Sequence, residues 1–73
     1  MKVYVTFGQG HTHSINDIVL DHNCVAVIDC ESRSHGREKA FDYFGRKFSI
    51  EYFEDEWNRD DIKYYSRGYI EVL

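Results

Sequence analysis

The stretch CVAVIDC at residues 24–30 is apolar on both faces of an extended chain, and the expected fold is built around it. Successive side chains of a strand point to opposite faces, so Val25 and Val27 lie on one face while Ala26 and Ile28 lie on the other. A strand that is covered on both sides has this composition, whereas a half-exposed strand alternates between apolar and polar residues. We therefore predict a strand in the middle of a sheet at residues 24–30.

Shorter strand patterns lie on both sides of this stretch. Residues 2–7 (KVYVTF) and 48–52 (FSIEY) alternate with a period of two, and residues 69–73 could form a last short strand. Between them, residues 11–20 are predicted to form a hairpin arm whose turn is Asn16-Asp17, because both residue types tolerate turn conformations.

One helix is predicted after the central strand. Ser32 or Ser34 can cap its first turn, and Gly45 can end it in a left-handed conformation. The expected inward stripe has the spacing i, i+3, i+4, i+7 and consists of the Arg37 stem, Ala40, Phe41 and Phe44.

Together these elements predict a single α+β domain over residues 1–73, with a mostly antiparallel sheet of about four strands and one helix packed on one face. The 73-residue chain has 42% apolar residues, 12 aromatic side chains (six Tyr, five Phe, one Trp) and no proline. Large aromatic side chains can supply much of the core of so short a chain.

Several features indicate a protein of the cytoplasm. No stretch approaches the roughly 20 apolar residues of a membrane span, and no signal-peptide pattern opens the chain. If residues 24–30 form one strand, Cys24 and Cys30 lie about 20 Å apart, too far for a disulfide. We expect both cysteines to be reduced and structural.

The charge is unevenly distributed along the chain. The formal net charge of −4 disfavours binding to nucleic acid or to an anionic membrane, and favours a partner with a basic surface. Residues 51–61 hold six acidic residues and one basic residue, together with aromatic side chains that could anchor a protein partner. The candidate partner-binding residues are Glu51, Glu54, Asp55, Glu56, Trp57, Asp60 and Asp61.

Two other interpretations of the charged segments stay open. Phe53 and Trp57 could face the core while the carboxylates are simply solvated. Arg33 and Arg37, one helical turn apart, could form a phosphate-binding face, although acidic residues interrupt it.

The histidines suggest an alternative function. His11 and His13 form a His-x-His pair that a strand would point to one side, and His22, Cys24 or Asp21 could add a third metal ligand. Either histidine could also serve a small hydrolase as a general base. A His-x-His pair supplies only two ligands, so we expect histidines that pack or lie on the surface, and no metal or other cofactor.

Four parts of the chain resemble small accessory proteins carried by bacteriophages and prophages. They are the opening MKVYVTFGQGHTH, the strand at residues 25–28, the His35-Gly36-Arg37 helix start and the YSRGYI ending at residues 65–70. The resemblance implies a protein made in a bacterial host that binds and blocks a host or defence protein; inhibitors of CRISPR effector complexes are one such class. It maps no functional residue onto this chain.

The leading hypothesis from the sequence is a non-enzymatic protein-binding module without catalytic residues. Its partner would be a host or defence protein with a basic surface. An exposed edge strand could also pair two copies into a homodimer.

Overall fold

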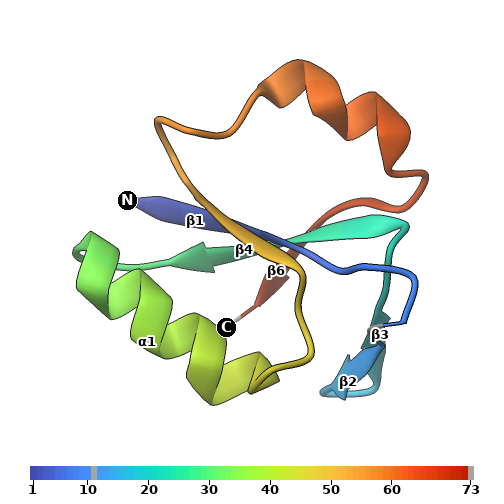
Figure 1. The fold of residues 1–73 in the computed structure, drawn as a ribbon, viewed down its shortest axis with the longest axis horizontal. Coiled ribbons are helices and arrows are strands. Elements are labelled where there is room, and N and C mark those ends of the chain that lie inside the picture. Colours follow the sequence, from blue (N-terminus) through green and yellow to red (C-terminus); the bar gives the residue numbers. More distant parts are fainter. Residues whose placement is uncertain (11, 73) are drawn as a thin grey trace.

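A four-stranded mixed sheet lies in the middle of the molecule, with α1 on one face and η1 on the other (Figure 1). The computed structural model describes residues 1–10 and 12–72. In chain order the elements are β1 (Lys2–Thr6), β2 (His13–Ile15), β3 (Ile18–Leu20), β4 (Cys24–Asp29), α1 (Arg33–Phe44), β5 (Ile50–Phe53), the 3₁₀ helix η1 (Arg59–Tyr64) and β6 (Gly68–Val72). The predicted α+β class is confirmed.

The sheet has the strand order β5-β1-β4-β6. β1 pairs antiparallel with both β4 and β5, whereas β4 and β6 are parallel. β4, β5 and β6 therefore run in one direction and β1 in the other. Strands that run in the same direction need a crossover connection, and here α1 and η1 cross on opposite faces of the sheet.

The central position predicted for residues 24–30 is confirmed, because β4 lies between β1 and β6. Its Ala26 and Ile28 belong to the larger core, which α1 and the hairpin complete. Its Val25 and Val27 belong to a second core with Trp57, on the face that η1 covers. Both faces of β4 are therefore buried.

The hairpin β2–β3 turns where the sequence predicts it. Asn16 and Asp17 both have positive φ angles, 49° and 66°, as a two-residue hairpin turn of this hand requires. Arg67 ties the hairpin to the C-terminal part of the chain, because its guanidinium donates to the Val19 carbonyl and lies 3.4 Å from the Asp21 carboxylate. The backbone N–H of Asn23 donates a hydrogen bond to the Asp21 carboxylate. This hydrogen bond and the guanidinium of Arg67 lower the pKa of Asp21.

α1 begins and ends as predicted, but its buried face differs. The Ser32 hydroxyl accepts from the N–H of His35, and Gly45 ends the helix with a φ of 61°. The buried residues are Gly36, Ala40 and Phe44, whereas Phe41 is 45% exposed, so the predicted stripe of Arg37, Ala40, Phe41 and Phe44 is wrong for Arg37 and Phe41. No helix among the described residues is long and apolar enough to cross a membrane.

Gly36 explains the difference. A Cβ atom at this position would lie 2.4 Å from Val3 Cγ2 and 2.9 Å from Cys30 Sγ, so the helix backbone packs directly against β1 and the end of β4. Because of this close approach, the face of α1 that carries Gly36, Ala40 and Phe44 must point toward the sheet. The predicted stripe of Arg37, Ala40, Phe41 and Phe44 differs from the observed face because it leaves this glycine out.

Both cysteines lie in the core at either end of β4, as free thiols. The Cys24 thiol donates to the Asp21 carbonyl at 3.4 Å, and burial raises the pKa of Cys24. Their predicted structural role agrees with this placement.

We expect Gly36→Ala to destabilise the fold by about 1–3 kcal/mol, because the added methyl group overpacks the contact with Val3 and Cys30. The loss should appear although alanine favours a helix. Urea unfolding followed by the fluorescence of the single tryptophan, Trp57, measures it. Gly10→Ala is the matched control, since its Cβ meets nothing within 4 Å, and it should change stability by less than about 0.5 kcal/mol. Equal stability of the two variants would contradict the role given to Gly36.

Candidate functional site

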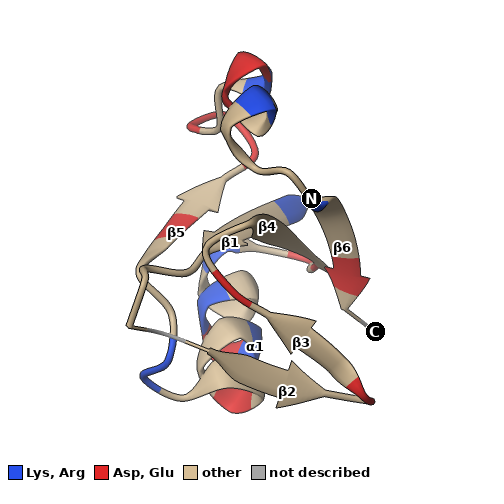
Figure 2. Cartoon of the chain, turned by 90° about the vertical axis from the view of Figure 1, so that its right-hand side faces the viewer, with Lys and Arg blue, Asp and Glu red and all other residues tan. Residues whose placement is uncertain are grey.

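The acidic segment predicted as a binding surface is not one continuous patch. It runs from β5, at one edge of the sheet, through the following turn and into η1, which lies above the sheet in Figure 2. Its residues lie in four different places: the second core, an ion-pair network with α1, a hollow on the α1 side of β5, and the 3₁₀ helix η1.

Trp57 belongs to the core and does not contribute to an exposed surface. Its side chain is 8% exposed, its ring stacks on Tyr4 with centroids 5.5 Å apart, and its Nε1 donates to the Tyr69 hydroxyl at 2.8 Å. Phe53 is half-buried against the larger core. For Trp57 the prediction of an exposed anchor is wrong, and the alternative, in which it faces the core, holds.

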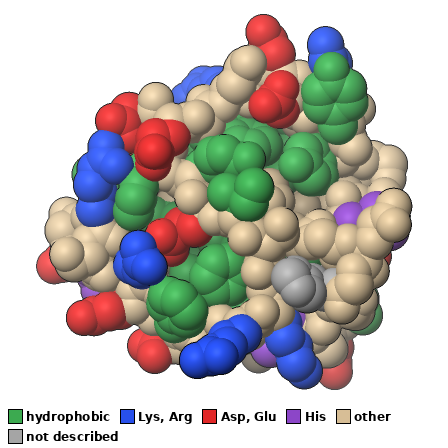
Figure 3. Space-filling view, viewed as in Figure 1, with side chains coloured by type: hydrophobic (Ala, Val, Ile, Leu, Met, Phe, Trp, Pro, Cys, Tyr) green, Lys and Arg blue, Asp and Glu red, His purple; other side chains and the backbone are tan. Residues whose placement is uncertain are grey.

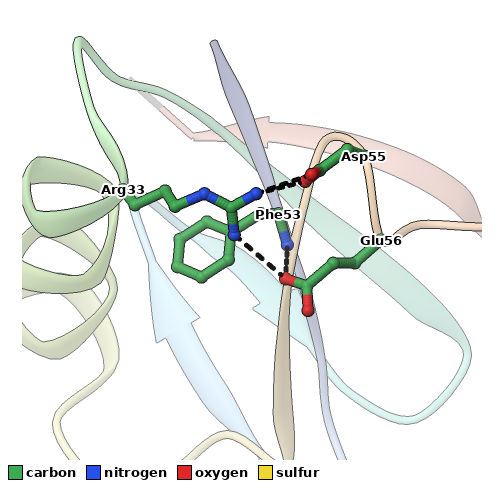
Figure 4. A network of polar contacts seen from close by, with 4 residues as sticks. All are labelled: Arg33, Phe53, Asp55 and Glu56. Carbon is green, nitrogen blue, oxygen red and sulfur yellow. Dashed lines mark hydrogen bonds and ion pairs between the residues drawn. The ribbon is translucent and has the colours of Figure 1, made fainter.

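Asp55 and Glu56 form an ion-pair network with Arg33 at the start of α1 (Figure 4). Arg33 Nη2 donates to both carboxylate oxygens of Asp55 at 2.6 and 2.7 Å, and Nη1 lies 3.6 Å from Glu56 Oε1. The guanidinium also lies over the ring of Phe53, 4.5 Å from its centroid. Arg33 is therefore engaged by carboxylates, so this network does not support the phosphate-binding interpretation of Arg33 and Arg37.

Glu51 lies on the α1 side of β5, because it pairs in register with the core residue Val5. It lines a hollow of about 300 Å³ between α1 and the edge of the sheet, which we call the β5 hollow. The lining residues of the β5 hollow are Arg37, Phe41, Phe48, Glu51, Phe53 and Glu56.

The carboxylate of Glu51 is poorly compensated. Its Oε2 is buried and has no hydrogen-bond partner among the described residues. Burial raises the pKa of Glu51; the positive charge of Arg37 acts in the opposite direction, and Glu56 raises it further. No ion pair within the described part of the chain joins Glu51 to a cation. A partly buried carboxyl group with a perturbed pKa, in a hollow, is a candidate for a functional site.

A second hollow adjoins the first along the exposed side of α1. It has a volume of about 500 Å³ and is lined by Ser34, Arg37, Glu38, Phe41 and Asp42; we call it the α1 groove. The two share Arg37 and Phe41, and together they present four carboxylates and one guanidinium. Figure 3 shows acidic, basic and hydrophobic side chains side by side on this face of the molecule.

The other acidic candidates lie away from the β5 hollow. Glu54 lines a different depression, with Lys2, Arg59 and Glu71 among its neighbours. Asp60 and Asp61 lie in the first turn of η1, where the free N–H groups of a helix favour negative charge. Of the seven predicted residues, only Glu51 and Glu56 meet in the β5 hollow.

The predicted histidine site is not assembled by the residues that the structure describes. His11 lies outside them. His13 is half-buried, with its ring edge-on to Phe44 at a centroid distance of 5.5 Å, and His22 is exposed. Within residues 1–10 and 12–72, no group of three His, Cys, Asp or Glu side chains could hold a metal ion.

Four residues that line the two hollows are absent from the predicted site: Phe41, Phe48, Glu38 and Asp42. The predicted stripe places Phe41 in the core, and the two acidic residues interrupt the basic face of Arg33 and Arg37. The signal that could have found them is Gly36: if its row faces the sheet, then Arg37, Phe41 and Glu38 lie on the exposed side of α1.

We expect Glu51→Gln to stabilise the fold at pH 7 by about 0.5–1 kcal/mol, a gain that solvent screening of this partly buried group keeps small. The raised pKa means that the folded state holds the Glu51 proton more tightly than the unfolded state does. The wild type therefore loses stability as the pH rises from 4.5, the ordinary pKa, through the raised value.

Urea unfolding between pH 4 and 8 measures this difference. It should be small at pH 4, where Glu51 is largely protonated in both states, and complete at pH 7. The control, Glu54→Gln, removes an exposed carboxylate and should change stability by less than about 0.5 kcal/mol at either pH. A Glu51→Gln variant that is less stable than the wild type at pH 7 would mean that the charge is held by a favourable contact.

No protein-family model matches the chain, and neither the curated proteins nor the solved structures include one that matches it. A fold alone does not identify a function, so the function is argued from the site.

Proposed function

We propose that this protein is a non-enzymatic binding module that takes up a basic surface of another protein at the β5 hollow and the α1 groove. The resemblance to phage and prophage accessory proteins favours a host or defence protein as the partner, with inhibition of a CRISPR effector complex as one example. In this proposal the protein acts in the bacterial cytoplasm by occupying a surface that its partner needs.

One observation carries the proposal: carboxylates and apolar side chains meet on one exposed face. The β5 hollow and the α1 groove hold four carboxylates against one guanidinium. Phe41 is 45% exposed there, and Phe48 and Phe53 line the β5 hollow with it. Apolar anchors supply contact area in protein interfaces, and carboxylates steer and select a basic partner.

The ion-pair network of Arg33 supports the same face. It holds the turn after β5 against the start of α1, so Glu56 keeps its place beside the β5 hollow. Each such pair is exposed and contributes at most about 1 kcal/mol to stability. The network favours binding because it holds the turn after β5 in place before the partner arrives.

The alternative function, a metal-binding or small hydrolytic protein centred on His11, His13 and His22, has no specific observation in its favour. His13 packs against Phe44 and His22 is exposed, while His11 lies outside the described residues.

We expect the triple variant Glu38→Gln, Asp42→Asn, Glu56→Gln to bind the partner about tenfold more weakly at low salt, because three of the four carboxylates of the two hollows are lost. Capture from bacterial lysate on the tagged protein, followed by mass spectrometry, identifies the partner, whose affinity is then measured at low and moderate salt. Wild-type binding should weaken as salt is added, and the variant should depend less on salt.

The matched control is Asp17→Asn, Glu31→Gln, Glu71→Gln, which changes the net charge equally at exposed positions outside both hollows. It should retain wild-type affinity. If the folded triple variant binds as the wild type does, the β5 hollow and the α1 groove are not the interface. If both triple variants lose affinity equally, net charge alone explains binding.

A further inference from the structure

We propose that the β5 hollow is a receptor for one arginine side chain of the basic partner, whose guanidinium lies against the phenylalanine rings and pairs with the carboxylate of Glu51. This inference rests on the proposed function and adds the chemistry of the anchor. Its occupant is a protein side chain; a free cation or a second copy of the chain is not required.

The walls of the β5 hollow suit a cation. Phe41 and Phe48 meet edge to face with ring centroids 5.4 Å apart, and Phe53 lines the hollow with them. The face of an aromatic ring carries negative potential, so it attracts a guanidinium placed within about 6 Å of its centroid. Three such rings beside two carboxylates combine apolar contact with charge complementarity.

The chain itself shows this recognition at the rim of the same hollow. The guanidinium of Arg33 lies 4.5 Å from the centroid of Phe53 and donates to Asp55, with Glu56 next to it (Figure 4). An aromatic ring flanked by carboxylates therefore already holds one guanidinium here. Glu51, inside the β5 hollow, has the same kind of neighbours, but no guanidinium forms an ion pair with it among the described residues.

Glu51 is the residue of the β5 hollow that lacks a hydrogen-bond donor for one oxygen of its carboxylate among the described residues. Its Oε2 is buried without a hydrogen-bond partner among the described residues, and a buried acceptor left without a donor is costly. The guanidinium of Arg37, which lies 5.8 Å from the centroid of Phe41, forms no ion pair with Glu51 among the described residues. Glu51 as a whole is only partly buried, so a guanidinium from the partner would bring several N–H donors to its carboxylate and would offset the negative charge.

The size and charge of the site select the occupant. About 300 Å³ is at the lower end of the range for small-molecule pockets, so the β5 hollow suits a single side chain. The adjoining α1 groove adds Glu38 and Asp42, which would repel a phosphate and favour further basic residues of the same segment. A guanidinium is planar and weakly hydrated, and it stacks on aromatic rings better than the ammonium group of lysine does.

The test is a titration of the full chain with short capped peptides, followed by NMR. The probe is acetyl-Gly-Arg-Gly-amide, and its matched control carries citrulline, which has nearly the shape of arginine but no charge. The arginine peptide should shift the Glu51 amide and the ring signals of Phe41 and Phe53, while the citrulline peptide should bind at least about tenfold more weakly. Equal responses to the two peptides would overturn the proposal. Tighter binding of acetyl-Gly-Lys-Gly-amide, the lysine analogue, would overturn it as well.

Variants of the β5 hollow separate charge from folding. Glu51→Gln should weaken the arginine peptide about tenfold although it does not destabilise the fold, while Arg37→Gln should tighten binding because it removes a competing cation. Glu54→Gln, outside the β5 hollow, should bind as the wild type does. Wild-type affinity in a folded Glu51→Gln variant would exclude Glu51 as the receptor.

The two proposals can fail separately. If the partner captured from lysate binds Glu51→Gln as tightly as the wild type, the arginine receptor is wrong while the binding module stands. If the arginine peptide behaves as expected but the captured partner is indifferent to salt and to the triple variant Glu38→Gln, Asp42→Asn, Glu56→Gln, the receptor stands and the proposed function of the two hollows is wrong.

Discussion

The burial of β4 on both faces is the constraint on which the rest of this structure depends. A strand with Val25 and Val27 on one side and Ala26 and Ile28 on the other must be covered twice, and 73 residues offer little chain to do it. α1 covers one side. On the other side η1 is short and buries none of its own residues fully, so the ring of Trp57, stacked on Tyr4, forms much of the cover.

The way in which α1 covers its side creates the candidate site. Gly36 allows the helix backbone to pack directly against β1, and this contact decides which side chains of α1 face inward. Phe41 and Arg37 are then left on the exposed side, next to the edge strand β5. A packing requirement of the core therefore places an aromatic ring and a charged residue where a partner can reach them.

Glu51 and Arg33 both lie near this edge of the sheet, but only Arg33 forms ion pairs among the described residues. Arg33 finds Asp55 and Glu56 within its own chain, and the three form a solvated network of modest energetic weight. Glu51 points toward the α1 side of the sheet, and one oxygen is buried without compensation among the described residues. Such a carboxylate costs the fold some stability, and residues of functional sites often do so.

The sequence by itself determined the features that depend on neighbours along the chain: the alternation that makes β1 and β4 strands, the Asn16-Asp17 turn, and the Ser32 and Gly45 ends of α1. Backbone preferences and side-chain periodicity act over a few residues, so they can be read locally. Only the tertiary structure decided the parallel pairing of β4 with β6, the inward face of α1, the burial of Trp57 and the pairing of Arg33 with Asp55, 22 residues away. These depend on contacts between segments that only the complete packing brings together, and the β5 hollow is one of their products.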